Sequence, residues 1–543
     1  MKVVVLGGTG VFGSRLADLL VRDGHDVVIA ARDLARVEAL GRRLGARSIR
    51  VDIRAELAPL WAEAPEAVVD AAGPFHAYDD DPWHLARACI ARRIDYLDLA
   101  DDAGFCLGLA ALDGAAKAAG CFALSGVSSV PALSSAAVAA LADGMAAVEE
   151  IDIAILPGNR APRGRSVVAA ILSRTGAMFP LWQGSRWEER RGWSDPRRYT
   201  LGPGLARRGY LIEVPDTRLF PARFGAASVS FRAGLELPVM NAGLVLLSRL
   251  RAVTGIAAGP RLVGTLRWLA LLLWPFGSAR GGMVVRVTGR RQGRLCRAEW
   301  RLLAEAGEGP FVPAVAARAI LRAAARIPPG AGPALTVLPL DEFEAAMADL
   351  RIGFGRDEGP ALPLFPAHLG AEFARLPVAV RQGHDWAGCL RMSGRATVTR
   401  GHGLAARLLA AVFRFPPENA DVALCVTKRD GPAGEIWERD FGGRVFRSHL
   451  ALGKGAITER FGPLTFTLGL VVRNGALHFP AIGGRFGPLP LPRALLPESI
   501  ATESEDCGRL RFDVELRAPF GLGRIVHYRG WLVPDAAVRF ETG

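Results

Sequence analysis

A chain of 543 residues is too long for one hydrophobic core, because cores stop growing near about 250–300 residues, so we expect several domains. The net charge is +13, but arginines carry most of it and lie scattered among apolar residues, which disfavours nucleic-acid binding. Seven widely spaced cysteines without a Cys-x-x-Cys pair indicate free thiols in a reducing cytoplasm rather than a disulfide framework. The chain also enters a strand directly after Lys2, unlike a signal peptide.

Short apolar segments alternate with amphipathic ones over the first 125 residues. Strands are predicted at 2–6, 27–31, up to 51, 67–71 and 122–125, and helices at 11–22, 34–44, 85–92 and 107–119. Short apolar strands between amphipathic helices form a parallel sheet that is covered on both faces. We therefore expect an α/β domain of the Rossmann type over residues 1–135.

A glycine-rich loop follows the first predicted strand and opens a helix. In this loop, Gly7 permits a tight turn, Gly10 lets the backbone approach a pyrophosphate, and Gly13 allows the helix to pack close to the sheet. Amide groups at the start of the helix then face the phosphates. The predicted contacts in this segment are Gly7, Thr9, Gly10, Val11, Phe12 and Gly13.

The end of the second predicted strand indicates which dinucleotide is bound. Arg32 stands there, about 20 residues beyond the glycines, where an NAD-specific enzyme places a carboxylate for the ribose 2′-hydroxyl. A guanidinium suits a 2′-phosphate, so NADP(H) is predicted, whereas the adjacent Asp33 is interpreted as a helix N-cap. Asp52 is either an adenine-side contact or a turn former, and Ala72, Gly73 and Pro74 are expected to pass beneath the cofactor.

Residues 136–355 are predicted to form an α+β domain. Strands are expected at 151–156, 228–237, 283–288 and 296–303, separated by long Gly-, Pro- and Arg-rich loops, and helices at 315–326 and 340–350. The most apolar segment, 262–276, reaches about 15 residues and is shorter than the about 20 that a membrane-spanning helix needs. It is interpreted either as a shallow anchor on the inner face of a membrane, with Trp268 and Trp274 among arginines, or as a core or dimer-interface helix.

Residues 368–543, beyond a Pro- and Gly-rich linker at 359–366, are predicted to form a β-rich antiparallel domain with one helix at 404–413. Strands are expected at 421–428, 436–441, 444–450, 464–472, 476–479 and 511–516. Asp430-Gly431 and Asn474-Gly475 are typical of hairpin turns. The alternating Phe466, Leu468, Leu470 and Val472 line either a core or a cup for a lipid-like ligand.

Several motifs resemble the saccharopine-dehydrogenase-like oxidoreductase family. They are the loop 7–13, Ala-Gly-Pro-Phe at 72–75, Ala88-Cys89 before Tyr-Leu-Asp-Leu-Ala at 96–100, and Gly-Val-Ser-Ser-Val-Pro at 126–131 near the expected nicotinamide. Asp101-Asp102 stands where the family has Gly-Glu, and Ser128-Ser129 where it has Asp-Ser. The resemblance implies a mixed sheet in the middle domain that carries substrate contacts and dimerisation. Residues from about 368 resemble the domain of unknown function numbered 4166.

The favoured function is an NADP(H)-dependent oxidoreductase that acts on an apolar small molecule. The alternative is a non-catalytic NADP-binding protein at the membrane periphery that binds lipid or a partner. Candidates for the proton donor or acceptor near the expected cleft are His76, Tyr78, Asp98, Asp102 and Ser129. No metal is predicted, because no His or Cys stands at ligand spacing near the acidic residues 79–81.

Overall fold

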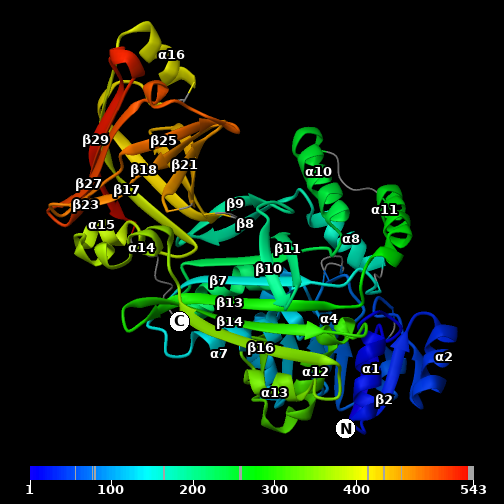
Figure 1. Ribbon diagram of the computed structural model, residues 1–543. Coiled ribbons are helices and arrows are strands. Elements are labelled where there is room, and N and C mark those ends of the chain that lie inside the picture. Colours follow the sequence, from blue (N-terminus) through cyan, green and yellow to red (C-terminus); the bar gives the residue numbers. More distant parts are fainter. Residues whose placement is uncertain are drawn as a thin grey trace.

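Three large sheets follow one another along the computed structural model (Figure 1). It describes residues 1–535 apart from 56, 76–77, 79–80, 163–164, 256–259, 413–414, 432–433 and 454. The candidate His76 and the predicted helix end at Phe413 lie outside the described residues. The N-terminal sheet and its helices are at the lower right of Figure 1, the second sheet crosses the centre, and the third sheet lies at the upper left.

The first sheet is parallel and has the order β15-β6-β5-β4-β1-β2-β3. Its strands are β1 (Lys2–Leu6), β2 (Asp26–Ala31), β3 (Arg47–Arg50), β4 (Ala67–Asp70), β5 (Asp95–Asp98), β6 (Phe122–Ser125) and β15 (Gly330–Pro333). The helices of this region are α1 (Gly13–Arg22), α2 (Leu34–Leu44), α3 (Ala58–Trp61), α4 (His84–Ile90), α5 (Ala103–Gly108), α6 (Asp113–Ala119) and α7 (Ser134–Ala142). Val3 and Val5 pack into one core cluster and Val4 and Leu6 into another, so both faces are covered. The predicted Rossmann-type fold is confirmed.

Strand β15 was not predicted, because its Gly-Ala-Gly-Pro sequence carries no alternation of apolar residues. It pairs in parallel with β6. The preceding helix α12 (Val312–Arg322) contacts α1 and is buried along nearly its whole length. On this helix, Arg318 donates to Asp23 at 2.7 and 2.9 Å. The chain therefore returns to the first sheet after completing most of the second.

The second sheet is mixed, with the order β10-β11-β12-β7-β13-β14-β16; β12 and β7 are parallel, and the other pairs are antiparallel. Its strands are β7 (Ala147–Leu156), β10 (Arg197–Gly202), β11 (Leu205–Leu211), β12 (Ser228–Ala233), β13 (Gly281–Arg291), β14 (Arg294–Ala304) and β16 (Ile352–Pro360). A separate hairpin contains β8 (Met178–Gln183) and β9 (Arg186–Arg191). Strands β9, β10 and β11 were not predicted because their Arg and Glu residues hide the two-residue period, whereas β8 was not predicted because Pro180 interrupts it.

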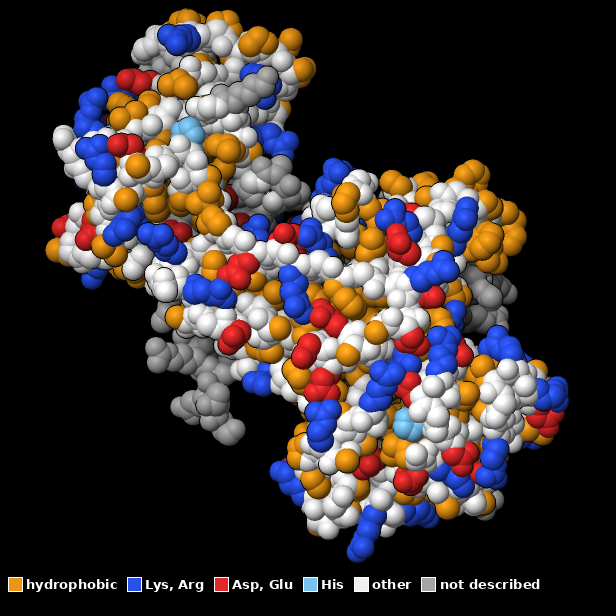
Figure 2. All heavy atoms as spheres, turned by 60° about the horizontal axis from the view of Figure 1, so that its bottom comes forward, with side chains coloured by type: hydrophobic (Ala, Val, Ile, Leu, Met, Phe, Trp, Pro, Cys, Tyr) orange, Lys and Arg blue, Asp and Glu red, His pale blue; other side chains and the backbone are white. Residues whose placement is uncertain are grey.

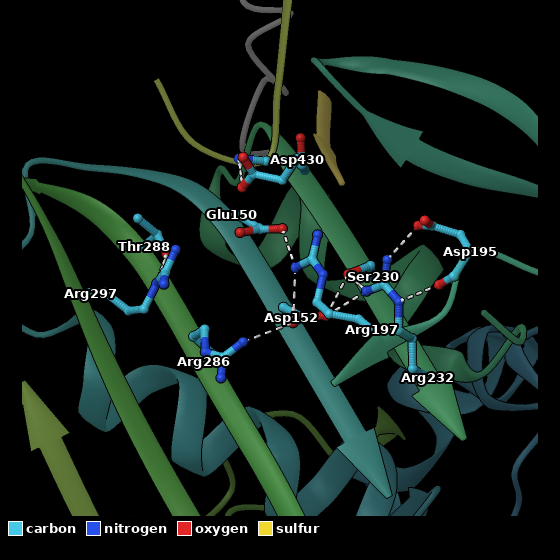
Figure 3. A network of polar contacts seen from close by, with 12 residues as sticks. Glu150, Asp152, Asp195, Arg197, Ser230, Arg232, Arg286, Thr288, Arg297 and Asp430 are labelled. Atoms are coloured by element: carbon cyan, nitrogen blue, oxygen red, sulfur yellow. Dashed lines mark hydrogen bonds and ion pairs between the residues drawn. The ribbon is translucent and has the colours of Figure 1, made fainter. Parts of the chain in front are cut away.

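One face of the second sheet carries a buried ionic network (Figure 3). Asp152 of β7 is fully buried and accepts from Arg232 at 2.6 Å, from Arg197 at 3.0 Å and from the Tyr199 hydroxyl at 2.8 Å, and Arg286 lies 3.5 Å away. Burial alone would raise the pKa of Asp152, but the three guanidinium groups hold this pKa well below its usual range. Each of these arginines also binds a second carboxylate. The network therefore joins neighbouring strands and leaves no charge unpaired for a ligand.

Two helices, α10 (Pro238–Thr254) and α11 (Pro260–Leu272), project from the second sheet between β12 and β13 (Figure 1). The apolar segment 262–276 forms most of α11 and the 3-10 turn η4 (Trp274–Phe276). The other helices here are α8 (Arg165–Arg174), α9 (Pro215–Phe224) and α13 (Leu340–Ala345). Throughout the described ranges, none of the helices combines the length and the apolar character that crossing a membrane requires.

The third sheet is antiparallel, as predicted, and has 13 strands. They are β17 (Cys389–Arg400), β18 (Asn419–Gly431), β19 (Gly434–Phe441), β20 (Arg444–Leu452), β21 (Ile457–Phe461), β22 (Leu464–Leu468), β23 (Val471–Arg473), β24 (Ala476–His478), β25 (Ala481–Phe486), β26 (Leu489–Pro490), β27 (Glu498–Asp506), β28 (Arg509–Arg517) and β29 (Arg524–Pro534). Its helices are α14 (Leu364–Leu369), α15 (Val378–Gln382) and α16 (Leu404–Val412). Leu468 belongs to a core cluster, and the partly buried Phe466, Leu470 and Val472 pack against this cluster.

The two predicted turns of this sheet had different outcomes. Asn474-Gly475 joins β23 to β24 with positive φ values of 50° and 71°, which confirms the predicted turn. Asp430-Gly431 is instead the paired end of β18, because Gly431 lies opposite Gly434. Residues 432–433 lie outside the described part. Gly359 and Pro360 of the expected linker end β16.

Candidate dinucleotide and substrate site

A cavity of about 840 Å³ lies between the first and second sheets. One part of its wall comes from loops at the carboxyl ends of β1, β2 and β4, which is where dinucleotides bind in sheets of this type. The opposite part comes from one face of the second sheet. Ten of the eleven predicted cofactor-binding residues line this cavity: Gly7, Thr9, Gly10, Val11, Phe12, Arg32, Asp52, Ala72, Gly73 and Pro74.

The glycine-rich loop has the backbone geometry that its sequence predicts. Gly7 has a φ of +65°, and a Cβ atom there would lie 2.5 Å from the Ala72 Cα. Gly13, the eleventh predicted residue, lies behind the loop, where a Cβ atom would come within 2.4 Å of the Gly7 carbonyl oxygen. Helix α1 begins without a side-chain cap. The Ser14 and Arg15 amides donate to the Gly10 and Phe12 carbonyl oxygens, so the amide groups of Val11, Phe12 and Gly13 are the ones that can face an anion. The loop thus forms a cradle whose shape suits a pyrophosphate. Residues larger than glycine would fill this space.

Two arginines surround the position expected for the ribose of the dinucleotide. Arg32 follows β2, and Arg36 lies in the first turn of α2; both side chains are exposed and line the cavity. Neither guanidinium forms an ion pair with a described residue. Asp33 accepts from the Arg36 amide at 3.2 Å and caps α2, so its carboxylate is used by the helix as predicted. Arg36 was not predicted, because it lies in the first turn of the helix and not at the strand end where a 2′-phosphate contact is expected.

Asp52 lines the cavity and also forms a turn. Its carboxylate accepts from the Arg54 amide at 3.1 Å, which confirms the turn former, and the contact with the adenine side stays a prediction. Arg54 lines the same region of the cavity.

Two buried aspartates hold the loops beneath the cavity. Asp70, at the end of β4, accepts from the Ala72 amide at 2.9 Å and from the Tyr78 hydroxyl at 2.8 Å. Asp98, at the end of β5, accepts from Ser125 and from the amides of Ala100 and Gly126 at 2.8–2.9 Å. Burial raises the pKa of Asp98 to about 7, although these three hydrogen bonds lower it in part.

The proposed catalytic candidates fall into two groups. Tyr78 and Ser129 line the cavity. Burial is the main cause that raises the pKa of Tyr78 far above its usual value, and the nearby Asp70 carboxylate raises it further. Asp98 and Asp102 do not line the cavity. Asp98 positions loops, and Asp102 caps α5 by accepting from the Phe105 amide at 2.9 Å.

The wall formed by the second sheet is apolar. Ile155, Met283 and Leu302 are adjacent in the register of β7, β13 and β14 and face the cavity together. The remaining large apolar residues on this side are Trp193, Ile212, Val214, Phe231 and Leu235. These residues were not predicted as site residues, because they come from segments more than 100 residues apart in the chain that only the fold brings together.

One ion pair crosses between the two parts of the wall. Arg174 of α8 lies 3.3 Å from the Asp101 carboxylate and donates to the Asp101 carbonyl oxygen at 2.8 Å. Both residues line the cavity. In the described parts of the chain, His, Cys, Asp and Glu side chains form no group of three that could hold a metal ion.

The fold and the cradle define a dinucleotide-binding domain, and comparison with known families agrees. Residues 3–124 match the family described as the saccharopine dehydrogenase NADP binding domain, and residues 376–532 match a domain of unknown function, DUF4166. The resemblances inferred from the sequence and the nicotinamide dinucleotide cofactor are thereby confirmed. No functionally curated protein sequence matches the chain.

Solved structures with a similar arrangement are distant. Apo saccharopine dehydrogenase (L-Glu forming) from Saccharomyces cerevisiae is 14% identical with a TM-score of 0.48, covering 66% of this chain and 99% of that chain. GenD2 from gentamicin A biosynthesis, in complex with NAD, is 16% identical with a TM-score of 0.33, and the match covers 66% of this chain and 97% of that chain. A probable dehydrogenase from Thermotoga maritima is 10% identical with a TM-score of 0.33, covering 64% and 93%.

Proposed function

We propose that the protein is an NADP(H)-dependent oxidoreductase that acts on an apolar small molecule. The observation that carries this proposal is the continuous cavity, which extends from the dinucleotide cradle to the apolar wall of the second sheet. A bound dinucleotide and a substrate against that wall would therefore share one enclosed space, which hydride transfer requires.

The residues of the cradle orient the dinucleotide. The amide groups at the start of α1 suit the pyrophosphate, and the guanidinium groups of Arg32 and Arg36 suit a 2′-phosphate. The loops at 72–74 and 128–130, next to the second sheet, would then contact the nicotinamide end of the dinucleotide. When bound there, NADPH supplies a hydride.

Tyr78 is the proposed proton donor. It lines the cavity and its hydroxyl donates to Asp70 at 2.8 Å, so its O–H must turn from Asp70 to the substrate. Burial and Asp70 raise the pKa of Tyr78, so it would give its proton only to a strong base such as the alkoxide that hydride transfer to a carbonyl forms. Ser129 is a second hydroxyl on the wall and can hold the polar group of a substrate. The large apolar side chains, above all Trp193 and Phe231, exclude water from the reacting atoms.

A titration followed by a turnover screen tests this function. Purified protein is titrated with NADPH by fluorescence, and NADPH consumption is then followed with carbonyl and imine compounds of increasing alkyl length. We expect saturable binding and a kcat/KM that rises with alkyl length, because each buried methylene contributes about 0.8 kcal/mol. Binding without NADPH oxidation in any reaction would instead favour the non-catalytic alternative.

A further inference from the structure

The two helices that project from the second sheet have an apolar outer surface. On α10, Asn241, Leu244 and Ser248 face inward, whereas Val239, Leu246 and Val253 are exposed on the opposite face. On α11 and η4 the exposed large apolar residues are Trp268, Leu269, Leu271, Leu272, Trp274 and Phe276. Val253 and Phe276 keep 87% and 75% of their surface exposed. Figure 2 shows hydrophobic side chains gathered over this part of the molecule.

A helix that meets only water normally carries charged residues on its outer face. Residues 237–279 instead contain no Asp or Glu, while arginines stand at 249, 251, 261 and 267. An apolar surface with tryptophans and only positive charges complements an anionic lipid surface. A symmetric contact with a second copy would bring arginines against arginines without carboxylates to pair them, which disfavours a dimer interface.

The same helices are fastened to a loop of the cavity wall. The loop 157–162 contributes Gly158, Ala161 and Pro162 to the cavity wall. This loop is fastened to the end of α11, because the Asn159 side chain donates to the Leu273 carbonyl oxygen at 2.6 Å and the Trp274 indole nitrogen lies 3.4 Å from the Arg160 carbonyl oxygen. The apolar surface and this part of the cavity wall therefore form one connected region.

Glu236 holds the base of this region together. Its carboxylate accepts from the Asn159 amide at 2.6 Å and from Ser278 at 2.7 and 2.8 Å, and it lies 2.8 Å from Arg207. Partial burial opposes ionisation, but these hydrogen bonds and Arg207 hold the pKa of Glu236 below its usual value. The helices are thus attached to the cavity loop on both sides of their base.

We propose that α10, α11 and η4 dock on an anionic lipid surface and hold the loop 157–162 of the cavity wall against it, so that an apolar substrate enters from the lipid. The docking is inferred from the exposed apolar surface alone, whereas the entry of a substrate from the lipid rests on the proposed function. The tryptophans lie at the level of the lipid headgroups, and the leucines and Phe276 reach the acyl boundary.

Vesicle flotation tests the docking. Full-length protein is mixed with phosphatidylglycerol vesicles or with phosphatidylcholine vesicles. The wild type is expected to float with the former, and the variant Trp268→Ser/Leu272→Ser/Trp274→Ser to float at least about 10-fold less. The control is Leu362→Ser/Val378→Ser, which removes exposed apolar side chains beyond the opposite end of the second sheet, where Pro360 pairs with Cys296.

Flotation of the triple variant at the wild-type level, or no flotation of the wild type, overturns the proposal. Loss of a wild-type dimer in the triple variant without any flotation would also overturn it and would identify a dimer interface. NADPH titration of the same variants in solution keeps the two proposals distinguishable, because the triple variant is expected to bind NADPH as the wild type does. Weak NADPH binding by every protein would count against the proposed function and not against docking.

A label in the loop 157–162 tests its orientation. Ala161→Cys is introduced together with Cys507→Ser, since Cys507 is the exposed cysteine of the described chain, and carries an environment-sensitive fluorophore. Phosphatidylglycerol vesicles are expected to shift its emission to the blue, while a label at Leu362→Cys stays unchanged. Equal behaviour of the two labels contradicts a loop that faces the lipid.

Discussion

One methyl group added at Gly7 should separate the two loops of the cofactor cradle, which are the glycine-rich loop 7–13 and the loop 72–74. In Gly7→Ala the Cβ atom would lie 2.5 Å from the Ala72 Cα, whereas ordinary contact begins at 3.4 Å, so the loops must move apart by about 1 Å. The positive φ adds about 1 kcal/mol, and overpacking of this kind costs typically about 1–3 kcal/mol in stability. Because both loops contact the dinucleotide, we expect the Kd for NADPH to rise at least about 10-fold, which is about 1.4 kcal/mol.

Gly45→Ala is the matched control. Gly45 has a φ of +67° at the end of α2, but a Cβ atom there meets nothing within 4 Å. It should therefore lose about 1 kcal/mol of stability without any change in NADPH affinity. Calorimetric titration gives the Kd values, and urea unfolding gives the stabilities. Wild-type affinity in a folded Gly7→Ala protein would refute the assigned loop geometry.

Three further substitutions test single side chains. Arg32→Ala should raise the Kd for NADPH about 10-fold or more and leave that for NADH unchanged, since only NADPH carries the 2′-phosphate; equal losses for both would contradict this role. Tyr78→Phe should keep NADPH affinity but lower kcat about 10²- to 10⁴-fold, and an unchanged kcat would exclude Tyr78 as donor. The free energy of unfolding of the wild type should fall as the pH rises toward about 7, because folded Asp98 keeps a proton that the unfolded chain has released. In urea titrations, Asp98→Asn should lack this part of the pH dependence while it still binds NADPH. Equal pH dependence of the two proteins would be evidence against the raised pKa of Asp98.

Features encoded by neighbouring residues could be predicted from the sequence. The positive φ of Gly7, the Asp33 cap and the Asn474-Gly475 turn each depend on only a few adjacent residues, and the structure contains all three. Asp430-Gly431 carries the same turn signal but continues a paired strand, because the register of β18 and β19 pairs Gly431 with Gly434.

Features that depend on distant residues could not be predicted. Strand β15 is defined by its partner β6 and not by its own Gly-rich sequence. The apolar wall joins Ile155, Met283 and Leu302 through the register of three strands. The raised pKa of Asp98 likewise follows from burial, and its hydrogen bonds reach residues almost 30 positions away, which the sequence alone does not place beside it.

The account depends most on the binding of a phosphorylated dinucleotide by the start of α1, Arg32 and Arg36. Parallel calorimetric titrations of the wild type with NADPH and NADH at low salt measure this binding directly. We predict saturable heat with NADPH and an affinity for NADH at least about 10-fold weaker, because NADH offers no 2′-phosphate to the two guanidinium groups. An absence of heat with NADPH, or equal affinity for the two dinucleotides, would contradict the account.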